Sequence, residues 1–397
     1  MHDGPRRTAP TPEVSDRRLA RELMEEFASG TGLASGRPPR RYLWTDAFAV
    51  CNYLGLWLTE GDDRDLELAL KLVSEVHRVL GRHRADDARR GWLSGLPDAA
   101  AARHPTAAGL RIGKPLPERA PGERLDPSLE WDRDGQYYHY LTKWMHALHR
   151  VHRVTGRPEY HRWAAELGLW AHHAFTHGPP GRRALYWKLS IDGSRPLVAS
   201  AGHHDPLDGL LTLATLQVET PAGAEVEGPD LRPATTELLS MCRGREWATE
   251  DPLGAGGLLV DAWRCWKLAD RLPGVGSVAG DVVRDAIVSY DVARTTLGHR
   301  RGTAGRLAFR ELGFVIGIRA AHALVGGATR AGTRAGPWPG PTGRELDALS
   351  RGSELAEGLE RFWADARHRE PEAWAAHRDI SQVMLATCLV PEGFLGD

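Results

Sequence analysis

The sequence predicts an all-α protein, an (α/α)6 toroid of six inner and six outer helices with short β-turn insertions. Three observations support this fold class. A loop that carries a carboxylate opens a hydrophobic helix six times, an amphipathic helix accompanies each of these, and no convincing order of strands is present. Helices that are apolar all round are buried on all sides, whereas amphipathic helices cover them. We therefore expect a ring of buried helices inside a ring of half-exposed ones.

Local signals justify the first two pairs. Ser15 is a plausible N-cap for an amphipathic helix that Gly30 ends, and the apolar run 47–58 that follows has no polar face. Gly61 breaks that run, and 65–80 returns with a single apolar stripe. The acidic, aromatic stretch before residue 137 leads into the second buried helix, and Pro158 suits the first turn of its partner.

The later pairs repeat this layout, and Pro391 ends the last buried helix. By this count the helix at 15–28 is left over, so we expect it to supply the sixth outer partner and close the ring. The expected inner helices are 47–58, 137–151, 205–216, 250–263, 309–320 and 378–389, and the expected outer helices are 15–28, 65–80, 158–175, 231–242, 281–297 and 355–366.

Composition limits the classes of function. The 397 residues include 42% hydrophobic and 26% charged residues, which is typical of a globular protein with a large core. We expect a disordered head at 1–14 and one domain at 15–397. The formal net charge of −1 lacks the long-range field of a non-specific nucleic-acid or anionic-membrane binder. With no secretory signal and no membrane-length apolar stretch, we expect a cytoplasmic protein.

Neither a metal nor another cofactor is expected. The four cysteines lie far apart without a zinc-like spacing, so they indicate buried, reduced thiols. The glycine-rich stretch 254–257 lacks the lysine of a phosphate-binding loop and follows no strand. The oligomeric state stays open.

The pattern of paired helices over roughly residues 15–395 resembles the (α/α)6 toroids of the six-hairpin glycosidase-like superfamily, which also contains the N-acylglucosamine 2-epimerase and cellobiose epimerase families. This resemblance implies a sugar or sugar-like ligand in a funnel at the N-terminal ends of the inner helices. On this chain the implied lining is Tyr42, Trp44, Asp46, Trp131, Asp132, Asp134, Gln136, Tyr137, His203, His204, Asp205, Asp208, Glu250, Asp251, Arg310, Glu311, His377, Arg378 and Asp379.

The main prediction is a carbohydrate-active enzyme, a glycoside hydrolase, with two alternatives. A glycoside hydrolase needs two carboxyl groups, for which we expect Asp134 opposite Glu250 or Asp251. A sugar epimerase or isomerase needs a base, such as one of the histidines at 203, 204 and 377. A toroid that has lost catalysis would bind a glycan, a peptide or a partner chain. Against all catalytic assignments stands ordinary capping, because carboxylates are favoured at helix N-termini.

Other candidate residues also allow two interpretations. The His203–Asp205 run suits a metal or a general base, or simply a polar loop whose aspartate caps a helix. The side chains of His139, Lys143 and His146 share one helical face and could line a cavity or form a polar seam between helices. The pairs Arg310–Glu311 and Arg378–Asp379 could clamp a ligand anion or pair with neighbouring acids. Tryptophans expected as sugar platforms are Trp44, Trp92, Trp131, Trp187 and Trp247, and those expected in the core are Trp57, Trp144, Trp163, Trp170 and Trp263.

Overall fold

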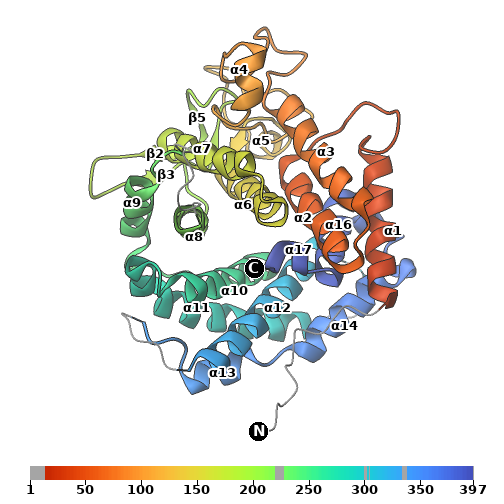
Figure 1. Cartoon of the computed structure of the whole chain (residues 1–397), viewed down its shortest axis with the longest axis vertical. Coiled ribbons are helices and arrows are strands. Elements are labelled where there is room, and N and C mark those ends of the chain that lie inside the picture. The colour runs from red at the N-terminus through yellow and green to blue at the C-terminus, as the bar shows by residue number, and fades with distance from the viewer. Residues whose placement is uncertain (1–13, 220–227, 299–301, 304, 333–337, 397) are drawn as a thin grey trace.

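Six buried helices form a closed ring in the computed structural model, which describes residues 14–219, 228–298, 302–303, 305–332 and 338–396 (Figure 1). Each inner helix contacts the next, and the last returns to the first. The fold class predicted from the sequence is therefore confirmed. In ring order the inner helices are α2 (Leu43–Glu60), α6 (Tyr138–Thr155), α8 (Asp205–Val218), α10 (Pro252–Leu268), α12 (Ala308–Ala331) and α16 (Arg378–Leu389).

An outer layer of helices covers the ring. The N-terminal helix α1 packs against α16, so it closes the ring as expected. The expected head falls almost entirely on residues 1–13, which lie outside the described residues, and α1 begins at residue 14. The outer helices are α1 (Val14–Gly30), α3 (Asp63–Leu80), α7 (Pro158–Phe175), α9 (Arg232–Cys242), α11 (Pro273–Gly298) and α14 (Ser353–Ala364), with α13 (Gly343–Leu349) against α11 and α12.

Two helices are longer than expected. Helix α11 starts at Pro273 rather than 281, although three glycines in that stretch favour a loop, because Val275 and Val278 are buried in the core. Helix α12 continues to Ala331 rather than 320, and Gly327 lets it approach Trp266, whose ring lies 2.4 Å from where a Cβ would stand. Tertiary packing thus overrides local propensity in both places.

The inner helices all run in the same direction. This follows from contacts between their N-terminal ends, which lie together at one end of the ring. The contacts are the Tyr42–Tyr140 hydroxyl pair at 2.6 Å, the His139–Asp205 approach at 3.9 Å, the Arg310–Asp251 ion pair and the edge contact between the rings of Phe309 and His377.

Short insertions cover this end of the ring. Strand β1 (Gln136–Tyr137) leads directly into α6 and pairs antiparallel with β4 (Lys188–Leu189), which pairs with β5 (Pro196–Val198). A second ladder joins β2 (Thr176–His177) to β3 (Ala184–Leu185). The loop between α3 and α6 also contains α4 (Asp98–Arg103) and α5 (Pro127–Glu130), and α15 (Glu372–Ala375) precedes α16.

The C-terminal segment turns back toward the centre of the ring after α16 (Figure 1). Its short helix α17 (Glu392–Leu395) contacts α2 and α6. The close approach depends on a glycine: a Cβ on Gly393 would lie 1.8 Å from the carbonyl oxygen of Cys51 and 2.6 Å from the backbone nitrogen of Gly55. This segment is therefore fitted into the ring wall.

Two expectations about the core can be checked here. All four cysteines are free and buried, as expected. Among the described residues, α12 is the one helix long and apolar enough to cross a membrane, with a mean hydropathy of 1.4 over its most apolar window. Since 67% of that window is buried inside the ring, its hydropathy is that of a core helix.

Candidate functional site

Asp134, the first choice for a catalytic acid or base, lies in a structural network. Its side chain is fully buried. One carboxylate oxygen accepts hydrogen bonds from the backbone N–H groups of Gly113 (2.9 Å) and Gly135 (3.0 Å). The other accepts from Arg111 (2.5 Å) and, at 3.4 Å, from Arg84. The Lys114 N–H also donates to the first oxygen, at 3.4 Å. Because five donors occupy both oxygens, this carboxylate holds the loop before α6 rather than facing a ligand.

The expected opposing acids also have other roles. Asp251 is the N-cap of α10, where one oxygen accepts a hydrogen bond from the Gly254 N–H at 2.9 Å and the other pairs with Arg310. Glu250 is exposed. The arginine expected as an anion clamp thus pairs with a neighbouring acid. None of these residues lines the cavity described below.

Four more residues that were expected to contact a ligand are buried and instead contact other parts of the protein. Trp44 lies in the core against Phe48. The carboxylate of Asp46 accepts a hydrogen bond from the Tyr42 N–H at 2.9 Å, at the start of α2. The amide of Gln136 donates to the carbonyl of Ile191 at 2.7 Å, and Glu311 accepts hydrogen bonds from Arg306 and Trp363. Their burial corrects the expectation that they line a funnel. Trp247, an expected platform, is also fully buried.

Aromatic residues do meet at the N-terminal end of the ring. Tyr137 lies in van der Waals range of Trp187 and of Tyr140, with ring centroids 5.2 and 5.1 Å apart. Trp131, which is 54% exposed, contacts Trp187 edge to face. The hydroxyl of Tyr42 joins this group through Tyr140. The sequence therefore identified a real aromatic cluster, although Tyr137 itself is buried.

The side chains of the histidine run before α8 form loop contacts, and none of them caps the helix. His203 is exposed, and the Nε2 atom of His204 lies 2.7 Å from the carbonyl oxygen of Trp247. Asp205 accepts a hydrogen bond from the Gly202 N–H at 3.1 Å. Within the described residues no group of three or more His, Cys, Asp or Glu side chains is placed to hold a metal ion. The contacts of His204 and Asp205 are those of a polar loop, but the expected capping of α8 by Asp205 is wrong, because its carboxylate accepts from the residue before the helix rather than from the first turn.

The remaining residues that were expected to line the funnel lie at the surface, at the N-terminal end of the ring. Asp132, His377 and Arg378 are exposed. The ring of His377 contacts Phe309, and Asp379 pairs with Arg40 at 2.6 Å.

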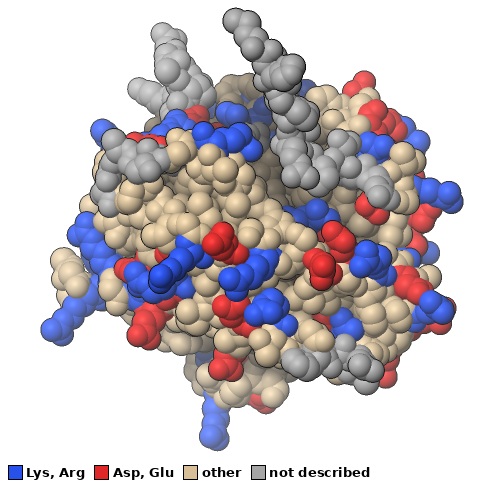
Figure 2. Space-filling view, turned by 90° about the horizontal axis from the view of Figure 1, so that it is seen from below, with Lys and Arg blue, Asp and Glu red and all other residues tan. Residues whose placement is uncertain are grey.

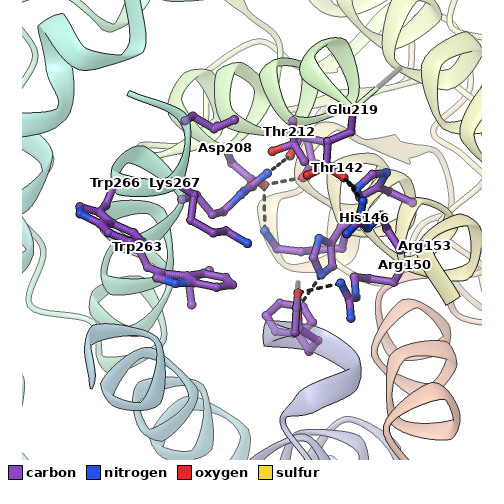
Figure 3. Close-up of a pocket in the computed structure, with 18 of the residues that line it drawn as sticks. Thr142, His146, Arg150, Arg153, Asp208, Thr212, Glu219, Trp263, Trp266 and Lys267 are labelled. Atoms are coloured by element: carbon purple, nitrogen blue, oxygen red, sulfur yellow. Dashed lines mark hydrogen bonds and ion pairs between the residues drawn. The ribbon is translucent and has the colours of Figure 1, made fainter. Parts of the chain in front are cut away.

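A cavity of about 340 Å³ lies inside the ring, between α6, α8, α10 and the C-terminal segment (Figure 3). Its lining runs from the N-terminal turns of α6 and α8, at Thr142 and Asp208, to their C-terminal ends at Arg153 and Glu219. Of the residues expected to line a funnel at the N-terminal ends, Asp208 is the one that lines this cavity. The volume falls in the range of small-molecule sites.

One buried carboxylate organises the wall of this cavity. Asp208 accepts hydrogen bonds from Lys143 (2.9 Å), Arg264 (3.0 Å) and the hydroxyl of Thr142. Arg264 also donates to the Thr212 hydroxyl at 2.8 Å. Burial opposes the charge on Asp208, but the two cations and the hydroxyl outweigh burial and hold its pKa well below the usual range. The carboxylate is therefore ionised.

The negative charge of Asp208 contributes to the raised pKa of two neighbouring aspartates. Asp205 and Asp261 are each almost fully buried. Burial, reinforced by the charge of Asp208, raises the pKa of Asp205 to about 7 and raises the pKa of Asp261 as well. Asp261 lies 3.3 Å from Arg264, which partly offsets the shift. Asp208 thus contacts both Lys143 and Arg264, and Asp261 contacts Arg264.

The C-terminal segment supplies the opposite wall. Arg150 donates to the carbonyl oxygens of Gly393 (2.9 Å) and Gly396 (2.6 Å), and the Nε2 atom of His146 lies 3.0 Å from the carbonyl oxygen of Phe394. A carbonyl can only accept, so this contact places the imidazole proton on Nε2 and leaves the lone pair on Nδ1. Burial, with nearby Arg264 and Arg150, lowers the pKa of His146 well below 6.5. The ring is therefore neutral at neutral pH.

Cations surround the C-terminal end of the cavity. Glu219 lies 3.0 Å from Nε2 of His149 and 3.4 Å from Arg153. The ammonium group of Lys267 lies over the ring of Trp263, 3.8 Å from its centroid (Figure 3). Trp263, expected in the core, thus also lines the cavity.

The sequence reveals part of this site. Lys143 and His146 share the helical face that was expected to line a cavity, and they do, whereas His139 lies closer to the N-terminal end against Asp205. Lys143 on α6 also donates to Asp208 on α8, so this helical face both lines a cavity and forms a polar contact between helices. Arg264 was missed. Its only signal is a charged residue in the mostly apolar helix α10, which also contains Asp261 and Lys267; this indicates a buried partner but does not identify it.

Comparisons with known proteins find a similarity among solved structures only. No protein-family model matches this chain, and neither does any curated protein. Among solved structures the chain is similar to the crystal structure of a sugar epimerase from a ruminal bacterium, with a TM-score of 0.46 and 10% sequence identity over 88% of this chain and 87% of that one. We therefore base the proposed function on the side chains of the ring itself.

Substitution of Asp205 by asparagine should change how stability depends on pH. Because the folded protein raises the pKa of this acid from 3.8 to about 7, it binds the proton more tightly than the unfolded chain, and the free energy of unfolding falls as pH rises from about 4 to about 7. The loss is at most about 4 kcal/mol. An asparagine side chain cannot ionise, so we expect the variant to gain stability relative to wild type across this window in urea unfolding.

The readout is the difference between the two proteins, because burial also raises the pKa of Asp46 to about 7 and that group remains in both. A difference that stays constant from pH 4.5 to pH 8 would show that Asp205 ionises normally.

Proposed function

We propose that the protein is a carbohydrate-active enzyme that epimerises or isomerises a small sugar-like molecule in the ring cavity, with His146 as the base. The observation that carries this proposal is an imidazole, held through its Nε2 atom by the Phe394 carbonyl, that lines the same cavity as Lys143 and Arg264. The histidine differs from the three expected from the sequence, which lie at the other end of the ring. The polar groups of this wall suit the hydroxyl groups of a sugar.

The chemistry follows from these positions. A base removes a proton from the carbon next to a carbonyl, and the C–H electron pair moves to form a C=C bond while the carbonyl π electrons move to oxygen. His146 would take that proton on Nδ1, and the cationic groups of Lys143 and Arg264 would stabilise the negative oxygen. Return of the proton to the other face of the same carbon gives the epimer. Return to the former carbonyl carbon, with transfer of the hydroxyl proton from the neighbouring oxygen to the former carbonyl oxygen, moves the C=O bond to the neighbouring carbon and gives the isomer.

The same cavity is poorly equipped for glycoside hydrolysis. That reaction uses one protonated carboxylic acid and one carboxylate on either side of the glycosidic bond. Among the described residues that line the cavity, the carboxylates are Asp208 and Glu219. Asp208 is ionised between two cations, and the hydrogen bond from His149 lowers the pKa of Glu219 to about 2. Neither can serve as the acid, so a proton-transfer reaction on the sugar fits better.

Solvent-deuterium exchange tests the proposal. The purified protein is incubated in D2O with a panel of aldoses, ketoses and N-acylated aminosugars, and NMR records deuterium at the carbon next to the carbonyl. We expect incorporation with at least one sugar and a loss of about a hundredfold or more in its rate for His146→Gln. The matched control is His173→Gln, an exposed histidine on the outer helix α7, which should keep the wild-type rate.

Two results would overturn this assignment. Equal rates for His146→Gln and wild type would remove the histidine from the mechanism. Sugar binding without deuterium incorporation or product from any member of the panel would favour a toroid that binds its ligand without turnover.

A further inference from the structure

A second pocket lies on the outer layer of helices, away from the ring cavity. It has a volume of about 590 Å³ and is lined by residues of α11 between 294 and 298 and by residues 350–355 at the start of α14. We call it the outer pocket. None of its described lining residues belongs to the helices that line the ring cavity.

Charge in the outer pocket differs from that of the molecule as a whole. The chain contains 51 Lys and Arg residues against 52 Asp and Glu residues, and Figure 2 shows both signs interspersed on one face. Among the described residues that line the outer pocket, Arg294 and Arg351 are basic and the exposed Glu354 is acidic. A preference for anions there would therefore come from local groups and not from the overall field.

The first turn of α14 forms one side of the outer pocket. Gly352, the N-cap of this 12-residue helix, has a φ of 105° and provides no side-chain cap. The N–H groups of a first helical turn have no partner within their helix, and the helix dipole places partial positive charge there. This end of α14 thus presents donors that an anion can bind.

Two arginines flank that helix end. Arg351 directly precedes the N-cap, and its exposed side chain forms no ion pair with any residue in the part of the chain that the structure describes. Arg294 lies 3.2 Å from Asp291, but both side chains are nearly half exposed, so water weakens this pair. Guanidinium groups bind phosphate oxygens through two parallel N–H groups, which suits them to this anion.

A buried tyrosine gives an independent indication of a ligand. Tyr290 is only 2% exposed, and its hydroxyl has no hydrogen-bond partner among the described residues. That hydroxyl lies 2.5 Å from where a Cβ on Gly352 would stand, against 3.2 Å for the nearest ring carbons, so it points toward the N-cap of α14. The charges of Arg294 and Arg351 both oppose the rise that burial causes in the pKa of this hydroxyl. Buried hydroxyls are normally hydrogen-bonded, so an unpaired one beside this helix end indicates a binding role.

We infer that the outer pocket binds a phosphate group, either free or carried by a small molecule. The first-turn N–H groups of α14 and the hydroxyl of Tyr290 donate to the phosphate oxygens, and Arg294 and Arg351 balance its charge. A tetrahedral dianion fits this set, because it offers several oxygens to donors from different directions and two charges to two arginines. The inference does not depend on the function proposed for the ring cavity.

Isothermal titration of the full-length protein tests this site. The probes are inorganic phosphate and glycerol 3-phosphate, each compared with sodium chloride at the same ionic strength. We expect one phosphate to bind per chain with a Kd of about 1 mM or tighter. Similar affinities for the two probes would show that the phosphate group alone is recognised, and tighter binding of the ester would show that the ligand is a phosphorylated molecule.

Substitutions locate the bound phosphate. Arg351→Met should weaken binding about tenfold, and Tyr290→Phe about fivefold, because each removes a donor to the anion. Glu354→Gln should strengthen binding about twofold, since it removes a negative charge from the lining. The matched control is Arg361→Met, an exposed arginine in the last turn of the same helix, which should bind as wild type does.

The Tyr290→Phe variant also guards against a general loss of structure. Removal of a hydroxyl that has no protein partner should leave the free energy of unfolding without phosphate unchanged or slightly higher. Weaker phosphate binding by this stable variant would support the site. Wild-type affinity in Arg351→Met would overturn the inference, because the anion would then bind elsewhere, as would the absence of binding by both phosphate probes. Neither of these results bears on the deuterium-exchange test of the ring cavity.

Discussion

Replacement of Asp208 by alanine should destabilise the protein by about 3–5 kcal/mol, because it leaves two buried cations without their shared counter-charge. Lys143 and Arg264 are only 27% and 11% exposed, and each lies about 3 Å from this carboxylate. Their remaining hydrogen bonds include the Thr212 hydroxyl and the partly protonated Asp261. Neither supplies a full negative charge, so the cations repel one another inside the ring. The loss is measured as the change in free energy of unfolding in urea.

The Asp208→Asn variant, measured in the same urea unfolding experiment, removes the negative charge of the side chain while keeping its shape. The amide keeps an oxygen that can accept a hydrogen bond, but it cannot neutralise a cation, so most of the loss should remain. The control is Asp281→Ala on α11, where an exposed carboxylate pairs with Arg284; this change should stay within about 0.5 kcal/mol of wild type. If Asp208→Ala costs less than about 1 kcal/mol, the wall is not held together by this carboxylate.

Replacement of Gly393 by alanine should displace the C-terminal segment from the ring. The added Cβ would lie 1.8 Å from the carbonyl oxygen of Cys51, and backbone on both sides must move to relieve that contact. We expect a loss of about 3 kcal/mol in the free energy of unfolding, at the upper end for overpacked sites. Movement of this segment would also separate Arg150 and His146 from the carbonyls that they contact. Ligand binding in the cavity should therefore weaken in parallel.

The matched control for that change is Gly358→Ala in the middle of α14, where a Cβ would meet no atom within 4 Å. Alanine is the better helix former, so this variant should gain up to about 1 kcal/mol. The tautomer of His146, read from its imidazole 15N shifts, gives an independent measure. We expect the proton on Nε2 in wild type and a mixture in Gly393→Ala. Wild-type stability together with an unchanged tautomer would show that the segment does not depend on this glycine.

Much of the architecture could be predicted from the chain. Apolar runs without a polar face gave the inner helices, and single apolar stripes gave the outer ones, because burial requires those periodicities. The leftover helix at 15–28 closes the ring, as the count of pairs required. The prediction failed where packing overrides propensity, as at residues 273–280, and it missed α17, whose place in the ring depends on a glycine contact with α2.

The site was predicted less well, for a physical reason. Carboxylates before each inner helix are visible in the sequence, but a cap and a catalytic acid look alike there. Only the fold shows that Asp134 is enclosed by five donors and that Asp251 binds the first turn of its own helix. The face of Lys143 and His146 was visible from helical spacing alone. Asp208 was also expected as a lining residue, but its pairing with Lys143 and the contact between His146 and Phe394 were not visible.

The sequence by itself determined the ring, because the alternation of buried and half-buried helices leaves few other ways to cover that much apolar surface. Only the tertiary structure decided where the ring is hollow and what charge lines the hollow. Asp208 and Arg264 lie 56 residues apart, and His146 and Phe394 lie 248 apart. Contacts over such separations depend on how six helices close on one another, and the electrostatic environment that they create is a property of that closure.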